Sequence, residues 1–388
     1  MNNNKSVGII GGGASGLLLS ILLKRKIPSL NITVYEALDK VGKKLLQTGN
    51  GKGNISNIHF DDSCYNKPFA LTLYTNDLRD LFKELGLKTK VDSEGRVYPY
   101  SEKASSILDI LLLNINKYGV NIITNCNIDK IIKKDKYYIY QNNNEYICDC
   151  LVLATGGISS INFDYKGYNL VKGLGHTVTK AMPSLVALKT KENTKALSGI
   201  RVKCIASIFN DNTCIEKTTG EVLFKDDGLS GIAILILSRH IKNDCENIIS
   251  LDLCPEMTED ELNEDLKLNT KEKLIGYFPK MINLDLCKRW ENSNKSIGYI
   301  IKHYTFKVID TYGFKNSQVT RGGVTLSEVN LKTNASLKQA NLYILGELLD
   351  IDGTCGGYNL HYAFNSAYNC YLDIKRKVQG EQNGNKEA

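Results

Sequence analysis

The chain has 388 residues, of which 42% are hydrophobic and 23% are charged, so it can bury one large core or two to three smaller ones. These proportions exclude a disordered or fibrous protein. The net charge of +7 comes from scattered basic residues, with no dense basic block or RNA-binding aromatic motif, so nucleic acid is not an expected partner. No run approaches the roughly 18 apolar residues of a membrane helix, so no membrane partner is expected either.

The eleven cysteines contain no Cys-x-x-Cys pair, which argues against a metal cluster or a thioredoxin-like redox site. The histidines are dispersed, and no metal is expected. The odd number of cysteines, the size of the chain and the glycines that interrupt its apolar start favour reduced thiols and a cytoplasmic protein.

The first predicted elements form a strand, a turn, a helix and a second strand. Val7–Ile10 is an apolar strand, Gly11–Gly16 has the pattern Gly-x-Gly-x-x-Gly, and Leu17–Lys24 has helical character. Ile32–Tyr35 then predicts a strand that ends in Glu36, about 20 residues beyond the glycines. The glycines alone would also fit an ordinary turn, but with the acid in place they indicate a dinucleotide site.

Each part of this motif has an expected role. Gly11 permits the tight turn, Gly13 lets a pyrophosphate approach the backbone, and Gly16 allows close packing of helix and strand. Ala14 and Ser15 open the helix, whose N–H groups and dipole favour the diphosphate. Glu36 would accept hydrogen bonds from the adenosine ribose.

The next segments complete a nucleotide-binding domain. Residues 41–54 contain too many glycines for a regular element, and a loop of this length is often functional. The remaining patterns predict helices at Asn76–Leu85 and Ser105–Lys117, a turn or hairpin at 92–99, a strand at Val120–Ile123, a meander at Ile128–Ile147, and a buried parallel strand at Leu151–Ala154 that ends in Thr155-Gly156-Gly157.

The second half changes character twice. From about Met182 to Leu253 the pattern is β-rich and predicts a barrel or sandwich, and residues 258–304 have helical spacing. Strands return at Val319–Val324 and Leu342–Leu345, a helix follows through Ala363–Tyr371, and Lys377–Ala388 is predicted to be a solvated tail. The predicted domains are 1–182 and 319–376 for the nucleotide-binding part, 183–255 for the β-rich part, 256–318 for the helical part and 377–388 for the tail.

With these motifs together, the chain resembles the BaiN-like, or aminoacetone oxidase-like, flavoproteins over nearly its whole length. The resemblance rests on the glycine turn and on blocks at Gly42–Asn57, Glu94–Pro99, Ala154–Gly157, Gly173–Thr177, Gly220–Phe224, Leu229–Gly231, Val319–Val324 and, most specifically, Gly346–Leu360. It implies an α/β fold: a Rossmann-like FAD-binding domain of the glutathione reductase/fumarate reductase type, interrupted by a β-barrel-like domain and a small helical domain.

Four departures from the family pattern put the substrate pocket and the retained activity in doubt. Lys52-Gly53-Asn54 replaces Arg-Cys-Asn, and the segment from Ile158 to Tyr168 is shortened. Cys355 stands where the family usually has threonine, and Arg321 stands at a position that is usually small.

By this resemblance the loop after Glu36 runs beneath the flavin, and the C-terminal block meets the ribityl and pyrophosphate region. The further residues expected at FAD are Lys43, Lys44, Leu45, Thr48, Gly49, Gly51, Asn54, Ile128, Ala154, Thr155, Gly156, Gly157, Gly346, Glu347, Asp350, Gly356, Gly357, Tyr358, Asn359 and Leu360. Solvated lysines and a purely structural turn remain the alternatives for the loop.

The helix that begins near Gly356 is predicted to direct its N-terminus at the pyrimidine edge of the flavin and to stabilise negative charge there. The candidate catalytic residues are Cys355, Tyr358, His361 and Arg321, although flavin carries the redox chemistry itself. Each has a structural alternative: Cys355 as a small packed residue, and His361 as a satisfied core histidine.

The expected function is an FAD-dependent oxidoreductase that moves hydride between NAD(P)H, or another donor, and a small organic molecule, which the family parallel suggests is an unsaturated carbonyl compound. No second glycine fingerprint appears, so NAD(P)H would bind transiently. The alternatives are an amine or aminoketone oxidase that uses oxygen, a non-catalytic FAD-binding protein, and a nucleic-acid-modifying enzyme, which the scattered charge disfavours. Neither the substrate nor the oligomeric state follows from the sequence.

Overall fold

The computed structural model describes residues 5–159 and 165–384, and the chain divides into two compact units. The first unit comprises Met1–Met182 and Val319–Ala388, and the second is the continuous segment Pro183–Gln318. The structure therefore differs from the predicted division of 183–255 and 256–318 into separate domains, since both lie in one unit.

The centre of the first unit is a seven-stranded sheet with the order β19-β20-β21-β10-β1-β2-β6. Its parallel strands are β1 (Ser6–Ile10), β2 (Asn31–Tyr35), β6 (Asn121–Ile123), β10 (Cys150–Leu153) and β21 (Leu342–Ile344), and the antiparallel edge is formed by β20 (Ala335–Ser336) and β19 (Val329–Asn330). All four residues of β10 are buried, as a parallel strand covered on both faces requires. This sheet confirms the predicted Rossmann-like α/β class.

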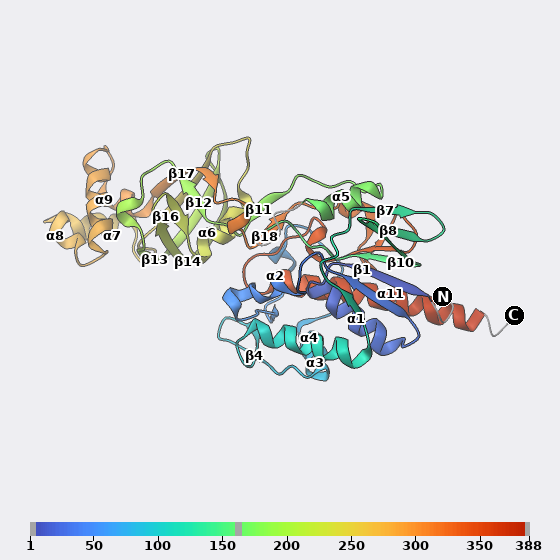
Figure 1. The fold of residues 1–388 in the computed structure, drawn as a ribbon. Helices are drawn as coiled ribbons and strands as arrows, with labels where there is room; N and C mark the ends of the chain where they lie inside the picture. The colour runs from blue at the N-terminus through green and yellow to red at the C-terminus, as the bar shows by residue number, and fades with distance from the viewer. Residues whose placement is uncertain (1–4, 160–164, 385–388) are drawn as a thin grey trace. The chain divides into compact units, whose positions relative to one another are not determined.

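Different layers cover the two faces of the sheet (Figure 1). On one face α1 (Ala14–Lys26) packs against α4 (Ala104–Tyr118) and α11 (Tyr358–Gly384). On the other lies a three-stranded sheet of β7 (Lys130–Lys133), β8 (Tyr137–Gln141) and β9 (Asn144–Cys148). Gly8 of β1 faces this small sheet so closely that a Cβ would lie 2.9 Å from Cys148 Sγ.

The remaining elements of the first unit are short. They are α2 (Lys43–Leu46), α3 (Thr75–Leu85), α5 (Lys166–Gly173), β3 (Ser56–Asn57), β4 (Thr89–Val91), β5 (Arg96–Pro99), β18 (Val319–Arg321), and the 3-10 turns η1 (Thr48–Gly51), η2 (Asp62–Cys64), η6 (Leu326–Glu328) and η7 (Gly346–Leu348). β3, β5 and β4 form an antiparallel sheet that contains the hairpin expected near 92–99.

Two predictions about regular structure are wrong. Residues 41–54 are not without regular elements, because Gly42 (φ +73°) precedes the short helix α2, which buries Leu45. The residues predicted to form a solvated tail instead belong to α11, which continues through Lys377 and Val378 to Gly384. Val378 is buried and Lys377 Nζ donates a hydrogen bond to the Tyr343 hydroxyl (2.8 Å), so packing extends the helix; residues 385–388 lie outside the described part.

The second unit is built on a closed six-stranded barrel with the order β12-β15-β14-β13-β16-β17. Its elements are β11 (Met182–Ser184), which begins one residue earlier, β12 (Leu188–Thr190), η3 (Lys195–Leu197), β13 (Arg201–Asn210), β14 (Thr213–Lys225), β15 (Gly228–Ser230), α6 (Ile232–Leu237), η4 (Ser238–His240), β16 (Asn247–Asp252), α7 (Glu259–Leu266), α8 (Thr270–Leu274), α9 (Lys280–Glu291), α10 (Ile297–Lys302), β17 (Tyr304–Thr311) and η5 (Phe314–Asn316). Phe224, Tyr304 and Phe306 pack as rings in its core. Because β17 completes the barrel after the helices, the helical segment is an insertion into it.

Candidate functional site

The candidate site is formed where the parallel strands of the first unit end. The glycine turn follows β1, Glu36 follows β2, Ala154 follows β10 and Gly346 comes two residues after β21. Open α/β sheets bind ligands at the carboxyl ends of their strands, and the topology therefore brings these separate segments to one edge.

The glycines of the turn after β1 have two different environments. Gly11 has a φ of +110° and its Cβ would lie 2.3 Å from Ala154 O, while a Cβ on Gly16 would lie 2.1 Å from Gly11 O. Gly13, in contrast, has no atom within 4 Å of the place a Cβ would take. The turn is thus closed by packing at its two ends and open in the middle, where α1 begins with the backbone of Ala14 and Ser15.

Glu36 fastens this turn to the second strand. Its Oε2 accepts a hydrogen bond from Gly12 N (2.9 Å) and its Oε1 accepts one from Leu38 N (3.0 Å), with 8% of the residue exposed. Each carboxylate oxygen has a further acceptor position, which suits ribose hydroxyls. Cys126 N bonds to Glu36 O (2.8 Å), and this contact brings the buried Ile128, two residues later, towards the same strand end.

The loop after Glu36 reaches the C-terminal block through a charged pair. Lys44 Nζ lies 2.8 Å from Glu347 Oε2, whereas Lys43 pairs with Asp39 on the surface. Thr48 Oγ1 donates to Leu45 O (2.7 Å) and starts η1, in which Gly49 adopts a left-handed conformation. Of the two lysines, the structure therefore brings Lys44 into the candidate site.

Glu347 also contacts Thr320, a residue whose role could not be predicted from the sequence. Its Oε1 accepts a hydrogen bond from Thr320 N (2.7 Å), and the Thr320 hydroxyl bonds to Ile158 N (3.0 Å) and Ser159 Oγ (2.8 Å). A Cβ on Gly157 would lie 2.5 Å from Glu347 Oε1. Thr320 lies in the block Val319–Val324 that supports the family resemblance. Nothing in its sequence context predicted that it would connect Glu347 to Ile158 and Ser159.

Glycines also allow the two ends of the chain to meet. Gly346 (φ +60°) lies where a Cβ would come 3.3 Å from Ser15 Oγ, and Gly346 N donates to Ser366 Oγ (2.9 Å). A Cβ on Gly357 (φ +102°) would lie 2.6 Å from Asn54 Oδ1. The N-terminal turn, the glycine loop and the C-terminal block thus share one region of the first unit.

The other expected cofactor residues divide into open and buried positions. Gly156 (φ +70°) borders open space and a Cβ on Gly51 would meet only Leu46 O, at 4.0 Å. Leu45 and Leu360, in contrast, belong to the hydrophobic core. Asn359 closes its own turn by exchanging hydrogen bonds with Gly353. Asp350 is buried, and its Oδ2 is engaged by Lys67 and by Thr179 Oγ1 (3.0 Å).

Comparison with known proteins identifies the family. The model of the HI0933-like protein Rossmann domain matches residues 5–372. The chain belongs to this family. It is 31% identical to the 3-dehydro-bile acid delta(4,6)-reductase of Clostridium scindens over 93% of the chain and 97% of that protein. It is 29% identical to the ribosomal RNA dihydrouridine synthase of Haemophilus influenzae over 95% of the chain and 98% of that protein.

A solved structure shows the same fold. The 3-ketosteroid delta1-dehydrogenase of Sterolibacterium denitrificans aligns with a TM-score of 0.52 and 11% identity, over 97% of the chain and 100% of that chain. As a member of the HI0933-like family, the chain is an FAD-dependent oxidoreductase. Within the described residues, no helix is both long and apolar enough to cross a membrane.

The observed residues fit FAD. The open position at Gly13 leaves room for a pyrophosphate beside the first turn of α1, and a side chain there would fill it. Asn54 Oδ1 and Thr155 Oγ1 are buried atoms for which the described residues provide no hydrogen-bond partner. The carboxyl edge of the sheet therefore combines backbone that a pyrophosphate can approach, a carboxylate that can accept hydrogen bonds from a ribose, and two further polar atoms that a dinucleotide can engage.

The polar groups of two catalytic candidates, Tyr358 and Arg321, form hydrogen bonds within the protein. The Tyr358 hydroxyl donates to His59 O (2.8 Å), and burial raises the pKa of this phenol. Arg321 donates a hydrogen bond to Met182 Sδ (3.0 Å). Cys355 is half-buried, three residues before α11.

His361 is part of a buried hydrogen-bond network rather than an exposed acid or base. Its Nε2 donates to Leu73 O (2.8 Å) and its Nδ1 lies 2.7 Å from Ser56 Oγ, which is itself 3.0 Å from Thr75 Oγ1. Burial lowers the pKa of His361 to about 4, so the ring is neutral at pH 7 and Nδ1 accepts the Ser56 hydroxyl. These contacts favour the structural alternative.

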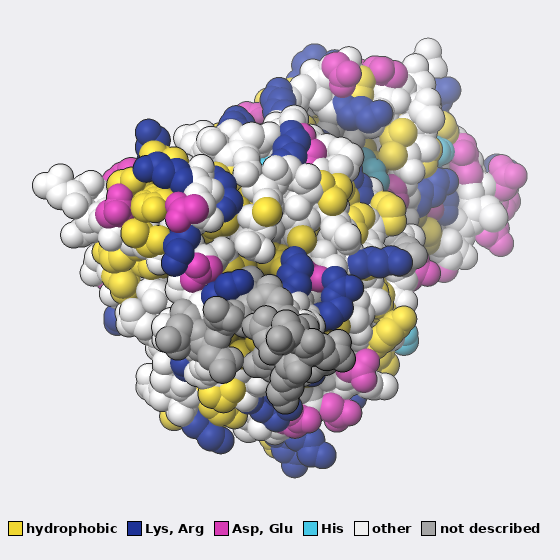
Figure 2. All heavy atoms as spheres, turned by 90° about the vertical axis from the view of Figure 1, so that its right-hand side faces the viewer, with side chains coloured by type: hydrophobic (Ala, Val, Ile, Leu, Met, Phe, Trp, Pro, Cys, Tyr) yellow, Lys and Arg dark blue, Asp and Glu magenta, His cyan; other side chains and the backbone are white. Residues whose placement is uncertain are grey.

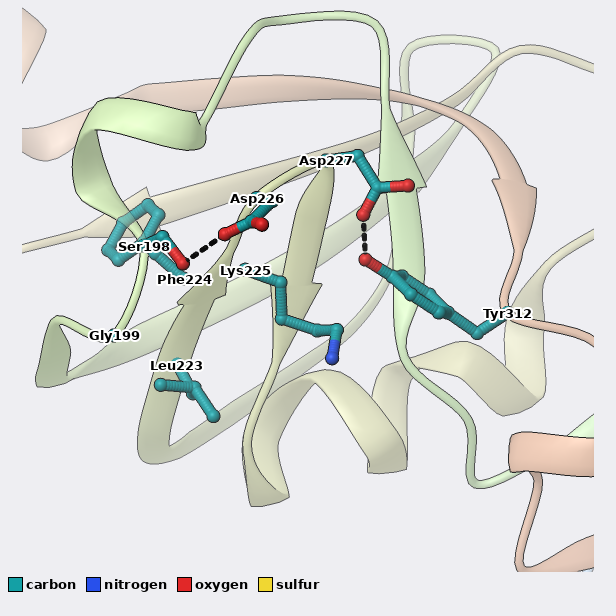
Figure 3. A pocket seen from close by; sticks show the side chains of 8 residues that line it. All are labelled: Ser198, Gly199, Leu223, Phe224, Lys225, Asp226, Asp227 and Tyr312. Atoms are coloured by element: carbon teal, nitrogen blue, oxygen red, sulfur yellow. Dashed lines mark hydrogen bonds between the residues drawn. The ribbon is translucent and has the colours of Figure 1, made fainter.

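The second unit has a pocket of about 420 Å³ beside the barrel (Figure 3). Its lining residues are Ser198, Gly199, Leu223, Phe224, Lys225, Asp226, Asp227 and Tyr312. Both acids are engaged, Asp226 by the Ser198 hydroxyl and Asp227 by the Tyr312 hydroxyl. The sequence did not single out any of these groups for chemistry.

Of the shortened segment from Ile158 to Tyr168, residues 160–164 lie outside the described part.

Proposed function

We propose that this protein reduces a carbon–carbon double bond conjugated to a carbonyl group, with NAD(P)H as the electron donor. The observation that carries the proposal is its near full-length similarity to two kinds of relative whose reactions share this chemistry. A delta(4,6)-reductase of a 3-dehydro compound acts on double bonds conjugated to a ketone. A dihydrouridine differs from uridine by two hydrogens across a double bond conjugated to the uracil carbonyl.

The residues at the sheet edge would hold FAD in a defined orientation. The N–H groups that open α1 would bind the pyrophosphate over Gly13, and Glu36 would accept hydrogen bonds from the adenosine ribose. Lys44 and Glu347, paired at 2.8 Å, would fix the glycine loop against the C-terminal block. When bound, FAD supplies hydride transfer between donor and substrate.

The start of α11 would tune this chemistry. Gly356 and Gly357 both have positive φ values and precede a helix that runs to Gly384. Gly357 abuts Asn54 of the glycine loop and Ser56 of β3. A helix N-terminus stabilises nearby negative charge, so we propose that it faces the pyrimidine edge of the ring. A structure with bound FAD in which this helix end points away from the ring would contradict the assignment.

A second substrate class has its own support. Two relatives, those of Haemophilus influenzae and Escherichia coli, are ribosomal RNA dihydrouridine synthases, and the second is 26% identical over 94% of the chain. This candidate departs from the expectation that nucleic acid is not a partner: the net charge of +7, although scattered along the sequence, does not oppose binding of a polyanion. A uridine in RNA is therefore the second candidate substrate beside a small unsaturated ketone.

An anaerobic experiment tests the reaction class. Purified protein, reconstituted with FAD, receives NADH or NADPH separately while the visible flavin band is followed. We expect one nucleotide to bleach the band, and a conjugated dienone or a uridine-containing RNA to restore it with the addition of two hydrogens to the acceptor, measured by mass spectrometry.

The outcomes separate the alternatives. A band that neither nucleotide bleaches would contradict the reductase and favour a non-catalytic protein. Peroxide formed in air from an amine, without NAD(P)H, would favour an oxidase instead. Failure to bind FAD at all would contradict the cofactor assignment. Gly13→Ala, which fills the open position of the turn, serves as the matched variant with impaired FAD binding.

A further inference from the structure

An exposed tyrosine with two adjacent lysines lies on the β4–β5 hairpin of the first unit. Tyr100 is 61% exposed, and the ammonium groups of Lys88 and Lys90 lie 5.0 Å and 5.6 Å from the centre of its ring. The face of this ring is therefore accessible to a partner, and the two ammonium groups lie beside it. The cluster therefore combines an accessible flat ring with concentrated positive charge.

The backbone holds this arrangement in place. Lys90 pairs directly with Tyr98 across the antiparallel hairpin, and Tyr100 N donates to Lys88 O (2.8 Å). The ring thus follows the last residue of β5, and both lysines extend from the opposite strand segment. The geometry is built by the sheet and does not depend on a flexible loop.

Two further lysines extend the charge towards the glycine loop. Lys52 lies 3.2 Å from Glu102, which also pairs with Lys90, and Lys103 follows in sequence immediately before α4. One carboxylate thus pairs with two of the four lysines. Gly53 packs against Ala104 of α4, where a Cβ would lie 2.9 Å from the Ala104 Cα, so the cluster borders the loop expected beneath the flavin.

A second lysine–tyrosine pair in the same unit shows what is distinctive here. Lys134 lies 4.8 Å from the ring of Tyr138, but the Tyr138 hydroxyl donates to Asp135 (3.2 Å) and Lys136 pairs with Asp149 (3.0 Å). The Tyr138 ring is thus only partly exposed and its hydroxyl is held by a carboxylate, whereas the Tyr100 ring is exposed. On the face shown in Figure 2, basic side chains lie singly or in small groups, with acidic side chains among them.

We propose that Tyr100 with Lys52, Lys88, Lys90 and Lys103 is a binding surface for single-stranded or looped RNA. Unstacked bases stack on aromatic rings, and lysines neutralise the flanking phosphates. This inference rests on the proposed function with uridine as the reduced base, because it gives that base a docking surface beside the loop expected at the flavin. The surface recognises RNA by shape and charge, with a stacked base as its anchor.

The test measures binding of a fluorescein-labelled uridine oligonucleotide to the FAD-loaded protein by fluorescence anisotropy over a series of salt concentrations. Tyr100→Ala should weaken binding roughly 5- to 100-fold, as expected for the loss of one stacked base. Tyr100→Phe should bind like the wild type because the ring remains. Lys88→Ala/Lys90→Ala should also weaken binding, and should reduce the salt slope by about 0.7 for each phosphate that is no longer neutralised.

The matched control is Lys134→Ala/Tyr138→Ala, which removes a lysine–tyrosine pair outside the proposed surface whose ring is only partly exposed, and it should leave binding unchanged. Flavin absorbance and thermal unfolding show that each variant is folded. The proposal is overturned if the wild type binds no RNA, or if the Tyr100 and lysine variants bind as tightly as the control. A wild type that reduces a dienone but binds no RNA loses this surface alone, whereas RNA binding without flavin reduction by NAD(P)H contradicts the proposed function alone.

Discussion

The two helices that begin at the candidate site, α1 and α11, both follow glycines but are built differently. The start of α1 is open, because Gly13 has no neighbour within 4 Å of a Cβ position. The start of α11 is held by its surroundings: Gly357 abuts Asn54, Tyr358 bonds to His59, and His361 bonds to Leu73 and Ser56. The same residue type thus leaves room for a ligand at one helix and permits close packing at the other.

The largest effect that would test this comparison is expected at the closed end of the α1 turn. A Cβ on Gly16 would lie 2.1 Å from Gly11 O, a backbone atom that cannot move without breaking the turn. Gly16→Ala should therefore destabilise the fold by more than about 3 kcal/mol, measured by urea unfolding of the apoprotein. The control is Gly173→Ala in α5, which meets no atom within 4 Å and should not lower stability. Equal stability of the two variants would contradict the packing argument.

The held start of α11 predicts a pH dependence. The folded-state pKa of His361, about 4, is lower than the unfolded value of about 6.5. Between these values the unfolded chain binds the proton and the folded chain does not, so stability rises with pH across this window. Titration of His361 should therefore lower the free energy of unfolding by about 3 kcal/mol as pH falls from above 6.5 to 4.

The variant His361→Leu isolates this contribution in urea unfolding at a series of pH values. At pH 7 it should be less stable than the wild type by about 2 kcal/mol, because Leu73 O and Ser56 Oγ lose their partner. The difference should shrink as pH falls, since only the wild type has the histidine to titrate. A difference that stays constant with pH, or a variant that folds normally but loses flavin turnover, would indicate a different role for His361.

The sequence predicted the α1 end better than the α11 end, and the reason is physical. The spacing of Gly11, Gly13 and Gly16 expresses a local backbone requirement, so the strand, turn and helix could be inferred from neighbouring residues. The contacts of Thr320 with Glu347 and of Ser56 with His361 join residues 27 and 305 positions apart, and no local pattern records them.

The boundaries show the same limit. Val378 is buried by tertiary packing, so α11 continues through Lys377, where composition alone indicated a solvated tail. Likewise β17 lies after a helical insertion, and only the closed barrel shows that it belongs with β12 and β16. Composition shifts therefore identified the changes of structure along the chain but not which segments pack together.

The open end of the α1 turn should respond differently from its closed end. Gly13→Ala places a methyl group in empty space, so apoprotein stability should match that of Gly173→Ala. The same methyl group would occupy the pyrophosphate position and weaken FAD binding roughly 5- to 100-fold, as steric overlap of this size typically costs about 1–3 kcal/mol. Titration of apoprotein with FAD, followed by fluorescence quenching, measures the affinity. Unchanged affinity would place the pyrophosphate elsewhere and remove the contrast with α11.

The smallest effect is expected at Tyr358, the first residue of α11. Tyr358→Phe removes one hydroxyl that donates to His59 O at 2.8 Å, while Tyr65 still donates to the Tyr358 carbonyl. The free energy of unfolding should fall by about 1 kcal/mol, the usual net value of one hydrogen bond. If the hydroxyl only anchors the helix, kcat of the FAD-loaded protein should stay within about twofold, a change smaller than one lost general acid causes. A kcat loss of about a hundredfold with little change in stability would assign the hydroxyl to proton transfer. In that case the start of α11 would be a reacting surface as well as a held one.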